Sequence, residues 1–101
     1  MTTVNLDVIA DGINILIQAR IRDPKTGESN AMQISDRRGL DAQTLCRVDL
    51  YDAMRLMRRL DPKVQFSINY DHADAILAEM FTPGAVEQFK DSLQTSLDRV
   101  A

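Results

Sequence analysis

The stretch from Asp41 to Leu60 constrains the fold most, because it has the period of a long helix with two unlike halves. At about 100° per residue, one half of this helix is apolar and the other half is polar. An apolar arc this wide is typical of a helix that buries deeply against a sheet. The arc consists of Leu45, Cys46, Leu50, Ala53, Met54, Leu56, Met57 and Leu60.

Both ends of this helix carry sequence signals. Asp41 can accept hydrogen bonds from the free amides of the first turn. Arg58 and Arg59 in the last turn place positive charge where the helix dipole favours it. Pro62 follows one residue after the helix, and the residue before a proline avoids the helical conformation. We therefore predict a helix over residues 41–60.

Two runs of alternating apolar residues come before this helix, joined by an Asp-Gly pair at 11–12. An Asp-Gly pair between alternating runs is typical of a β-hairpin, since both residues tolerate a positive φ. A two-residue turn at this pair would place Val8 opposite Ile15, with the apolar side chains on one face. The alternative is a helix over residues 4–22, which the glycine and the many β-branched residues disfavour.

A second turn at residues 23–27, with the sequence DPKTG, leads into a weaker alternating run over residues 29–36. Proline presets φ early in such a turn, and glycine takes the left-handed position that ends it. Closing the turn places Met32 opposite Ala19 and Ile34 opposite Ile17, on the apolar face. Residues 4–36 are therefore predicted to form a three-stranded β-meander with one apolar face.

The alternation returns after the helix, over residues 64–70, and predicts a fourth strand. A right-handed crossover would lay the helix across the apolar face of the meander. We expect the fourth strand to join one edge of the sheet, parallel to its neighbour, and the sequence leaves the choice of edge open. A short helix is predicted over residues 71–81. Thr82, as N-cap, and Pro83 then start an amphipathic helix that runs to the C-terminus.

These elements predict an α+β fold of two layers, in the order β-β-β-α-β-α-α. The four-stranded mixed sheet is a β-meander plus one strand after a crossover helix, with the helices on one face. A chain of 101 residues suits a single α+β domain covering residues 1–101. Its 45% hydrophobic and 27% charged residues are typical of a globular protein rather than a disordered one.

Charge and cysteine content exclude several classes of protein. A net charge of −3 argues against a nucleic-acid binder that acts through bulk positive charge. The single cysteine, Cys46, cannot form an internal disulfide, which favours a reducing compartment. No signal-like stretch opens the sequence, and it has no run of about eighteen apolar residues. We therefore expect a soluble, cytoplasmic protein that does not enter a membrane.

The sequence has no motif for a phosphate loop, a dinucleotide or a metal site. His72 lies close to Asp71 and Asp74, but a metal site needs three or four converging ligands, and helix capping explains these aspartates as well. Cys46 lies on the apolar arc, where cysteines are usually inert. We therefore expect no enzyme, no cofactor and no metal. The enzyme alternative is a small enzyme with its site near His72.

Asp49 interrupts the apolar arc of the helix. A buried carboxylate needs a partner. We expect that Asp49 lies near the rim of the sheet and reaches water or an arginine such as Arg20. The alternative is a salt bridge across an interface with another molecule.

The polar half of the helix is rich in arginine and also carries a tyrosine, and both residue types are enriched in interface hot spots. Guanidinium groups match the oxygens of carboxylates and phosphates. The alternative is a solvated face that nearby acids such as Asp52 neutralise. The candidate partner-binding residues are Arg47, Tyr51, Arg55, Arg58 and Arg59.

We therefore predict a small non-enzymatic protein-interaction module that docks an acidic partner surface through this face. It would be an adaptor, an inhibitor or a chaperone-like protein, of a kind that phages and mobile elements also encode. The partner would be another protein; a homodimer and a contact through the open edge of the third strand are further arrangements. The alternative is a nucleic-acid-associated protein using the same arginines. The polar face of the predicted sheet lacks the stacking aromatics of single-strand RNA readers, which disfavours it.

Overall fold

The computed structural model describes residues 2–100, and its elements come in the predicted order. The strands are β1 (Thr3–Asp11), β2 (Asn14–Arg22), β3 (Ser29–Arg37) and β4 (Gln65–Asn69), and the helices are α1 (Ala42–Leu60), α2 (Asp74–Met80) and α3 (Pro83–Val100). The sheet has the order β3-β2-β1-β4. Strand β4 joins β1 in parallel, while the other two pairs are antiparallel. The predicted α+β class, with its mixed four-stranded sheet, is confirmed.

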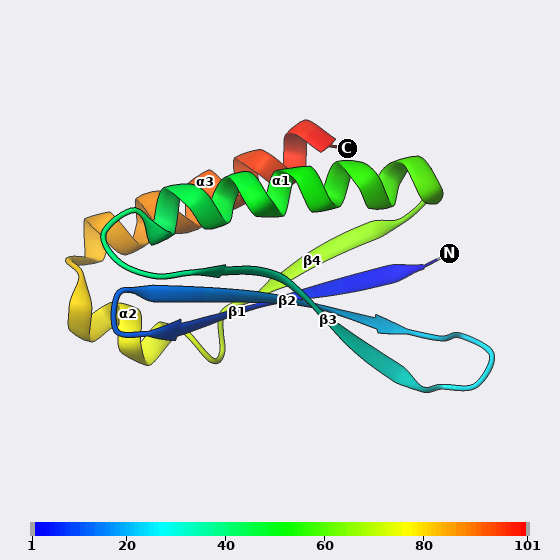
Figure 1. The fold of residues 1–101 in the computed structure, drawn as a ribbon, viewed down its shortest axis with the longest axis horizontal. Coiled ribbons are helices and arrows are strands. Elements are labelled where there is room, and N and C mark those ends of the chain that lie inside the picture. The colour runs from blue at the N-terminus through cyan, green and yellow to red at the C-terminus, as the bar shows by residue number, and fades with distance from the viewer. Residues whose placement is uncertain (1, 101) are drawn as a thin grey trace.

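Helices α1 and α3 lie side by side over one face of the sheet (Figure 1). Helix α2 lies at the end of the sheet where the β1–β2 hairpin turns (Figure 1). The core fills the space between the sheet and these helices, and each fully buried aliphatic side chain contributes roughly 1.5–3 kcal/mol. Within residues 2–100, no helix combines the length and the apolar character that a membrane crossing requires. The core includes Val4, Leu6, Val8, Ile15, Ile17, Ala19, Cys46, Leu50, Met54, Leu77 and Leu93.

The predicted register of the β1–β2 hairpin is wrong by two residues. Gly12 and Ile13 form the loop, so Val8 pairs with Ile17 and not with Ile15. Gly12 has a φ of 62°, and every positive φ among residues 2–100 belongs to a glycine. A turn with glycine at its first central position needs only that one positive φ, whereas a turn centred on the Asp-Gly pair needs two. A shift of two residues keeps the same side chains on the inner face.

Alanine at Gly12 should lower the free energy of unfolding by about 1–2 kcal/mol, because the left-handed backbone disfavours any Cβ. No atom lies within 4 Å of that added Cβ, so a clash contributes nothing. Gly84, in the first turn of α3, has the same open surroundings without the positive φ. Gly84→Ala should therefore raise the free energy of unfolding by about 0.5–1 kcal/mol. Urea unfolding measures whether the two substitutions change the free energy of unfolding in opposite directions. Destabilisation by both would contradict a turn that requires a positive φ at Gly12.

Strand β3 leaves the predicted alternation at a β-bulge. Met32 pairs with Ala19 as predicted, but beyond the bulge Ser35 takes the place opposite Ile17 that was predicted for Ile34. The extra residue in β3 moves every later side chain to the other face of the strand. Ser35 is consequently buried on the helix side of the sheet. Met32, near the start of the strand, is 52% exposed and contributes little to the core.

Helix α1 buries a narrower stripe than its apolar arc predicts. Leu45, Leu56 and Leu60 are exposed by 38%, 58% and 81%. Helix α1 packs over β2 and β3, and β3 is an edge strand with no neighbour on its outer side. Periodicity identifies an apolar side of a helix, but the width of the sheet decides how much of that side is covered. The buried residues of α1 are Ala42, Cys46, Leu50 and Met54.

The helix ends agree with the sequence in part. Asp41 precedes α1, but its carboxylate makes no capping hydrogen bond; its backbone oxygen accepts from the amide of Leu45 at 3.0 Å. Thr82 caps α3 as predicted, accepting from the amide of Ala85 at 3.3 Å. Helix α2 follows Ala73 and so starts three residues later than predicted. The predicted continuation of α3 to the last residue lies outside the described residues.

Candidate functional site

The arginines predicted to share one face of α1 separate into two groups. Arg47 and Tyr51 line a hollow at the seam between α1 and α3. Arg55 lies over the Tyr51 ring, 5.6 Å from its centroid, and so joins them. This distance suits a cation–π contact, which holds the guanidinium and the ring in place together.

The other two arginines of α1 have different surroundings. Arg58 leans over the ring of Phe66 in β4, 5.4 Å from its centroid, and also donates to the backbone oxygen of Pro62 at 3.4 Å. Arg59 lines a second hollow with Asp52, Arg55 and Leu56. The structure therefore brings Arg47, Tyr51 and Arg55 together, places Arg59 beside Arg55, and separates Arg58 from them.

An arginine of α3 completes the first group. Arg99 lines the same hollow as Arg47 and Tyr51, because α1 and α3 run in the same direction side by side (Figure 1). Small residues such as Ser92 and Ser96 line the seam on α3, which allows the two helices to approach closely. Arg47, Tyr51, Arg55 and Arg99 are called the arginine surface below. Sequence reasoning missed Arg99, whose only local signal is its place three residues after Ser96 on the flank of α3 that faces α1.

The arginines of this surface form no ion pair among residues 2–100, and the nearest acid that shares a hollow with Arg55 is Asp52. The ion pairs among residues 2–100 use Arg20, Arg37, Arg38 and Lys90. Arg47, Arg55 and Arg99 take part in none of them. Unpaired guanidinium groups retain their full capacity to bind carboxylates or phosphates in a fork geometry.

Asp49 does find an arginine, but it is Arg37 and not Arg20. The Arg37 Nε donates to Asp49 Oδ2 at 2.7 Å and its Nη2 donates to Oδ1 at 2.9 Å. The Ser35 hydroxyl donates to Oδ2 at 2.6 Å. Arg20 instead pairs with Asp7, at 3.4 Å. The bulge in β3 explains this, because it turns Ser35 and Arg37 toward α1.

This cluster has a clear electrostatic consequence. The hydrogen bond from Arg37 holds the pKa of Asp49 below its usual value, with a further contribution from Ser35, although burial opposes the shift. The same contact raises the pKa of Arg37. The cluster joins α1 to the edge strand β3 within one chain, so it is a structural contact and uses no binding partner.

The residues near His72 do not converge on a common point. Asp74 accepts from Lys90 at 2.7 Å, and the Asp71 amide donates to Asn69 at 2.9 Å. His72 is exposed. Within residues 2–100, no three or more histidine, cysteine, aspartate or glutamate side chains are close enough together to hold a metal ion.

Cys46 is fully buried in the core, and its Sγ donates to the backbone oxygen of Gln43 at 3.2 Å. Burial, followed by the charge of Asp49, raises the pKa of this thiol to about 12. The thiol is therefore protonated at neutral pH and lacks the thiolate form that a nucleophile requires.

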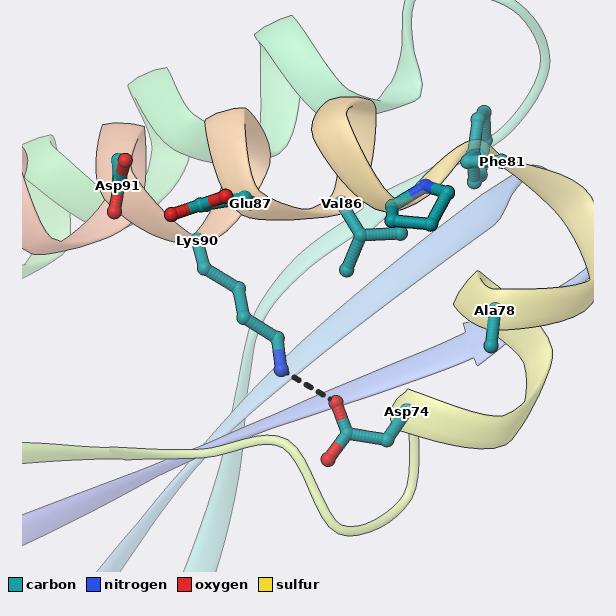
Figure 2. Close-up of a pocket in the computed structure, with 8 residues that line it drawn as sticks. Asp74, Ala78, Phe81, Val86, Glu87, Lys90 and Asp91 are labelled. Carbon is teal, nitrogen blue, oxygen red and sulfur yellow. Dashed lines mark hydrogen bonds and ion pairs between the residues drawn. The ribbon is translucent and has the colours of Figure 1, made fainter.

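A groove of about 570 Å³ separates α2 from α3 (Figure 2). Lys90 reaches across it from α3 to Asp74 at the start of α2, as Figure 2 shows, and also lies 4.7 Å from the centroid of the Tyr70 ring. Burial raises the pKa of Tyr70 to about 12, with help from Asp74 and Asp91. The groove has apolar walls and a charged rim; its lining residues are Asp74, Ala78, Phe81, Pro83, Val86, Glu87, Lys90 and Asp91.

Two surfaces therefore differ in chemistry from the rest of the chain. The arginine surface is positive and surrounds a shallow hollow, whereas the groove combines apolar walls with more carboxylates than cations. No family model, no curated protein and no solved structure matches this chain. Its function is therefore inferred from these surfaces.

Proposed function

We propose that this protein is a small, non-enzymatic protein-interaction module of the cytoplasm that docks an acidic protein through its arginine surface. One observation carries the proposal: Arg47, Arg55 and Arg99 converge on Tyr51 from two helices, and none of them has an ion-pair partner among residues 2–100. An adaptor, an inhibitor and a chaperone-like protein would each use such a surface. The single cysteine, buried and free, suits a reducing compartment.

The surface is also held in place before a partner binds. Arg55 rests on the Tyr51 ring, and Tyr51 belongs to the middle of α1, where packing against the sheet holds the backbone. Ordering a long side chain at an interface costs about 0.5–1.5 kcal/mol. A guanidinium already placed by an aromatic ring avoids part of that cost, which favours docking over a purely solvated role.

The overall charge favours a protein partner over a nucleic acid. The chain has a net charge of −3, so the positive surface is a local feature of an acidic molecule. Phosphate backbones attract extended basic surfaces and would be repelled by the acidic remainder. The outer sheet face offers polar residues such as Asn5, Asp7 and Gln18 and no base-stacking aromatics in these strands.

Reversing two charges of the surface, with Arg47→Glu and Arg55→Glu together, should reduce binding of the partner about tenfold or more, because like charges then face each other. Affinity purification from the native host with quantitative mass spectrometry measures the loss. The matched control is Arg22→Glu with Lys25→Glu, the same change of charge in exposed residues around the β2–β3 turn. Far-UV circular dichroism should be unchanged in both variants.

The proposal requires proteins that the wild type and the control retain and the surface variant loses. Equal recovery by all three proteins would rule out the arginine surface as the docking site. A low-salt gel shift with DNA and RNA tests the alternative partner. Retardation by the wild type, lost in the surface variant, would assign the surface to nucleic acid instead.

A further inference from the structure

The groove between α2 and α3 lies on the flank of α3 that faces away from α1. At about 100° per residue, the α3 residues that line the groove and those that line the seam with α1 fall on opposite flanks of the helix. No residue lines both the groove and the hollow of the arginine surface. The groove is therefore a separate feature. Its α3 residues are Pro83, Val86, Glu87, Lys90 and Asp91, and those of the seam are Ala85, Gln88, Phe89, Ser92, Ser96 and Arg99.

The groove has the size and the walls of a small-ligand site. Its volume of about 570 Å³ lies within the range of roughly 300–1,000 Å³ that ligand pockets occupy. Phe81 and Val86 pack partly against the core and present their remaining surface to the groove. Only eight residues line it, whereas each side of a stable protein interface contributes about 20–30 residues. The groove therefore suits a small molecule better than a folded partner or a second copy of the chain.

The rim of the groove carries three carboxylates and one ammonium group. Lys90 extends away from α3 to Asp74, at 2.7 Å (Figure 2), and also lies 4.7 Å from the centroid of the Tyr70 ring. The charge of Lys90 is therefore already compensated. Glu87 and Asp91 form no ion pair among residues 2–100. The charge that the rim leaves uncompensated is negative.

The spacing of Glu87 and Asp91 favours one cation between them. They lie four residues apart on α3, which places their Cβ atoms about 5–6 Å apart, and like charges at this spacing disfavour each other. Both residues are exposed, so an ammonium group that meets them keeps part of its water. Val86 precedes Glu87 and places the apolar wall directly beside these carboxylates. A ligand that complements both features has an apolar body and a cationic end.

We propose that the groove binds a small organic cation with an apolar body, of the class of the arylalkyl and alkyl ammonium ions. The apolar body would lie on Phe81, Pro83 and Val86, and the ammonium group would face Glu87 and Asp91. This binding site is additional to the docking of an acidic partner, which uses the opposite flank of α3. It does not depend on that docking.

An NMR titration of the isotope-labelled full chain tests the site with three probes that share a phenylbutyl body. The probes are phenylbutylammonium, phenylbutanol and phenylbutyrate. The cation should shift the backbone amides around the groove with a Kd of about 1 mM or below, as suits a probe of about eleven non-hydrogen atoms. The alcohol should bind about threefold more weakly. The carboxylate should bind at least about tenfold more weakly, because the rim repels it.

Two variants separate the charge of the rim from the apolar walls. Glu87→Gln with Asp91→Asn should weaken binding of the cation about threefold to tenfold and leave binding of the alcohol unchanged. Glu28→Gln with Asp98→Asn removes the same charge from exposed residues outside the groove and should change neither affinity. Ala78→Phe, at an exposed position of α2, should fill the groove and abolish binding of all three probes with an unchanged circular dichroism spectrum.

Four results would overturn the proposal. They are no saturable shift of the groove amides at about 10 mM phenylbutylammonium, well above the expected Kd; equal affinity for the three probes; groove amides that shift with protein concentration alone, which would assign the groove to a second copy; and binding of a blocked phenylalanyl-lysine dipeptide without binding of phenylbutylammonium, which would assign it to a protein segment. Arg47→Glu with Arg55→Glu should bind phenylbutylammonium like the wild type. Failure of partner docking and failure of the groove are therefore separate results.

Discussion

Replacing Leu50 with alanine should lower the free energy of unfolding by about 3–4 kcal/mol. Leu50 is fully buried on the inward stripe of α1, between the helix and the sheet, so its loss leaves a cavity. A small domain is stable by only about 5–15 kcal/mol, and the melting temperature should therefore fall by roughly 15 °C. Guanidinium unfolding monitored by far-UV circular dichroism measures the change.

Leu60→Ala is the matched control, with the same chemical change on the same helix. Leu60 is 81% exposed, so its truncation should alter the free energy of unfolding by less than about 0.5 kcal/mol. Equal losses at the two positions would contradict the narrow buried stripe of α1. They would instead support the half-buried helix that its periodicity predicts.

Neutralising Asp49 with asparagine should destabilise the protein by about 1 kcal/mol at pH 7, a value reduced for the solvent that reaches the pair. The folded-state pKa of Asp49 is lowered, chiefly by Arg37. A lowered carboxyl pKa gives stability that is fully present above the unfolded-state pKa and is lost as the pH falls through the folded-state value. The gap between wild type and Asp49→Asn should therefore be constant near neutral pH and close below about pH 4.

Urea unfolding at a series of pH values between neutral and strongly acid measures this gap. Glu79→Gln is the control, since Glu79 is exposed on α2 and takes part in none of the ion pairs among residues 2–100. It should leave the acid side of the stability curve unchanged. A gap for Asp49→Asn that persists unchanged in acid would mean that shape, and not charge, links α1 to β3.

The order of elements and the inner faces of β1 and β2 could be predicted from the sequence, because both depend on local periodicity. The alternation in β1 and β2 and the helical period of α1 do not depend on which elements pack beside them. The predicted hairpin register was wrong because the register depends on which single residue takes a positive φ, and only Gly12 does so without cost. The bulge in β3 could not be predicted, because no local pattern distinguishes Ile34 as an extra residue.

The candidate site was predictable to a similar degree. Arg47, Tyr51 and Arg55 follow from the period of α1 alone. Arg99 does not, since its place beside them requires that α1 and α3 run side by side in the same direction. Arg58 does not belong to the arginine surface, because it lies over the ring of Phe66 in β4, the strand that pairs with β1. Likewise, Arg37 reaches Asp49 only because the bulge turns it inward.

Docking through the arginine surface is tested most directly by a charge swap with the purified partner that the wild type captures. Isothermal titration should show that Arg47→Glu with Arg55→Glu weakens binding about tenfold or more, while Arg22→Glu with Lys25→Glu does not. Changing the partner's acidic contact residues to lysine should restore binding to the surface variant and weaken binding to the wild type. A partner that binds the surface variant as tightly as the wild type would contradict the proposed function.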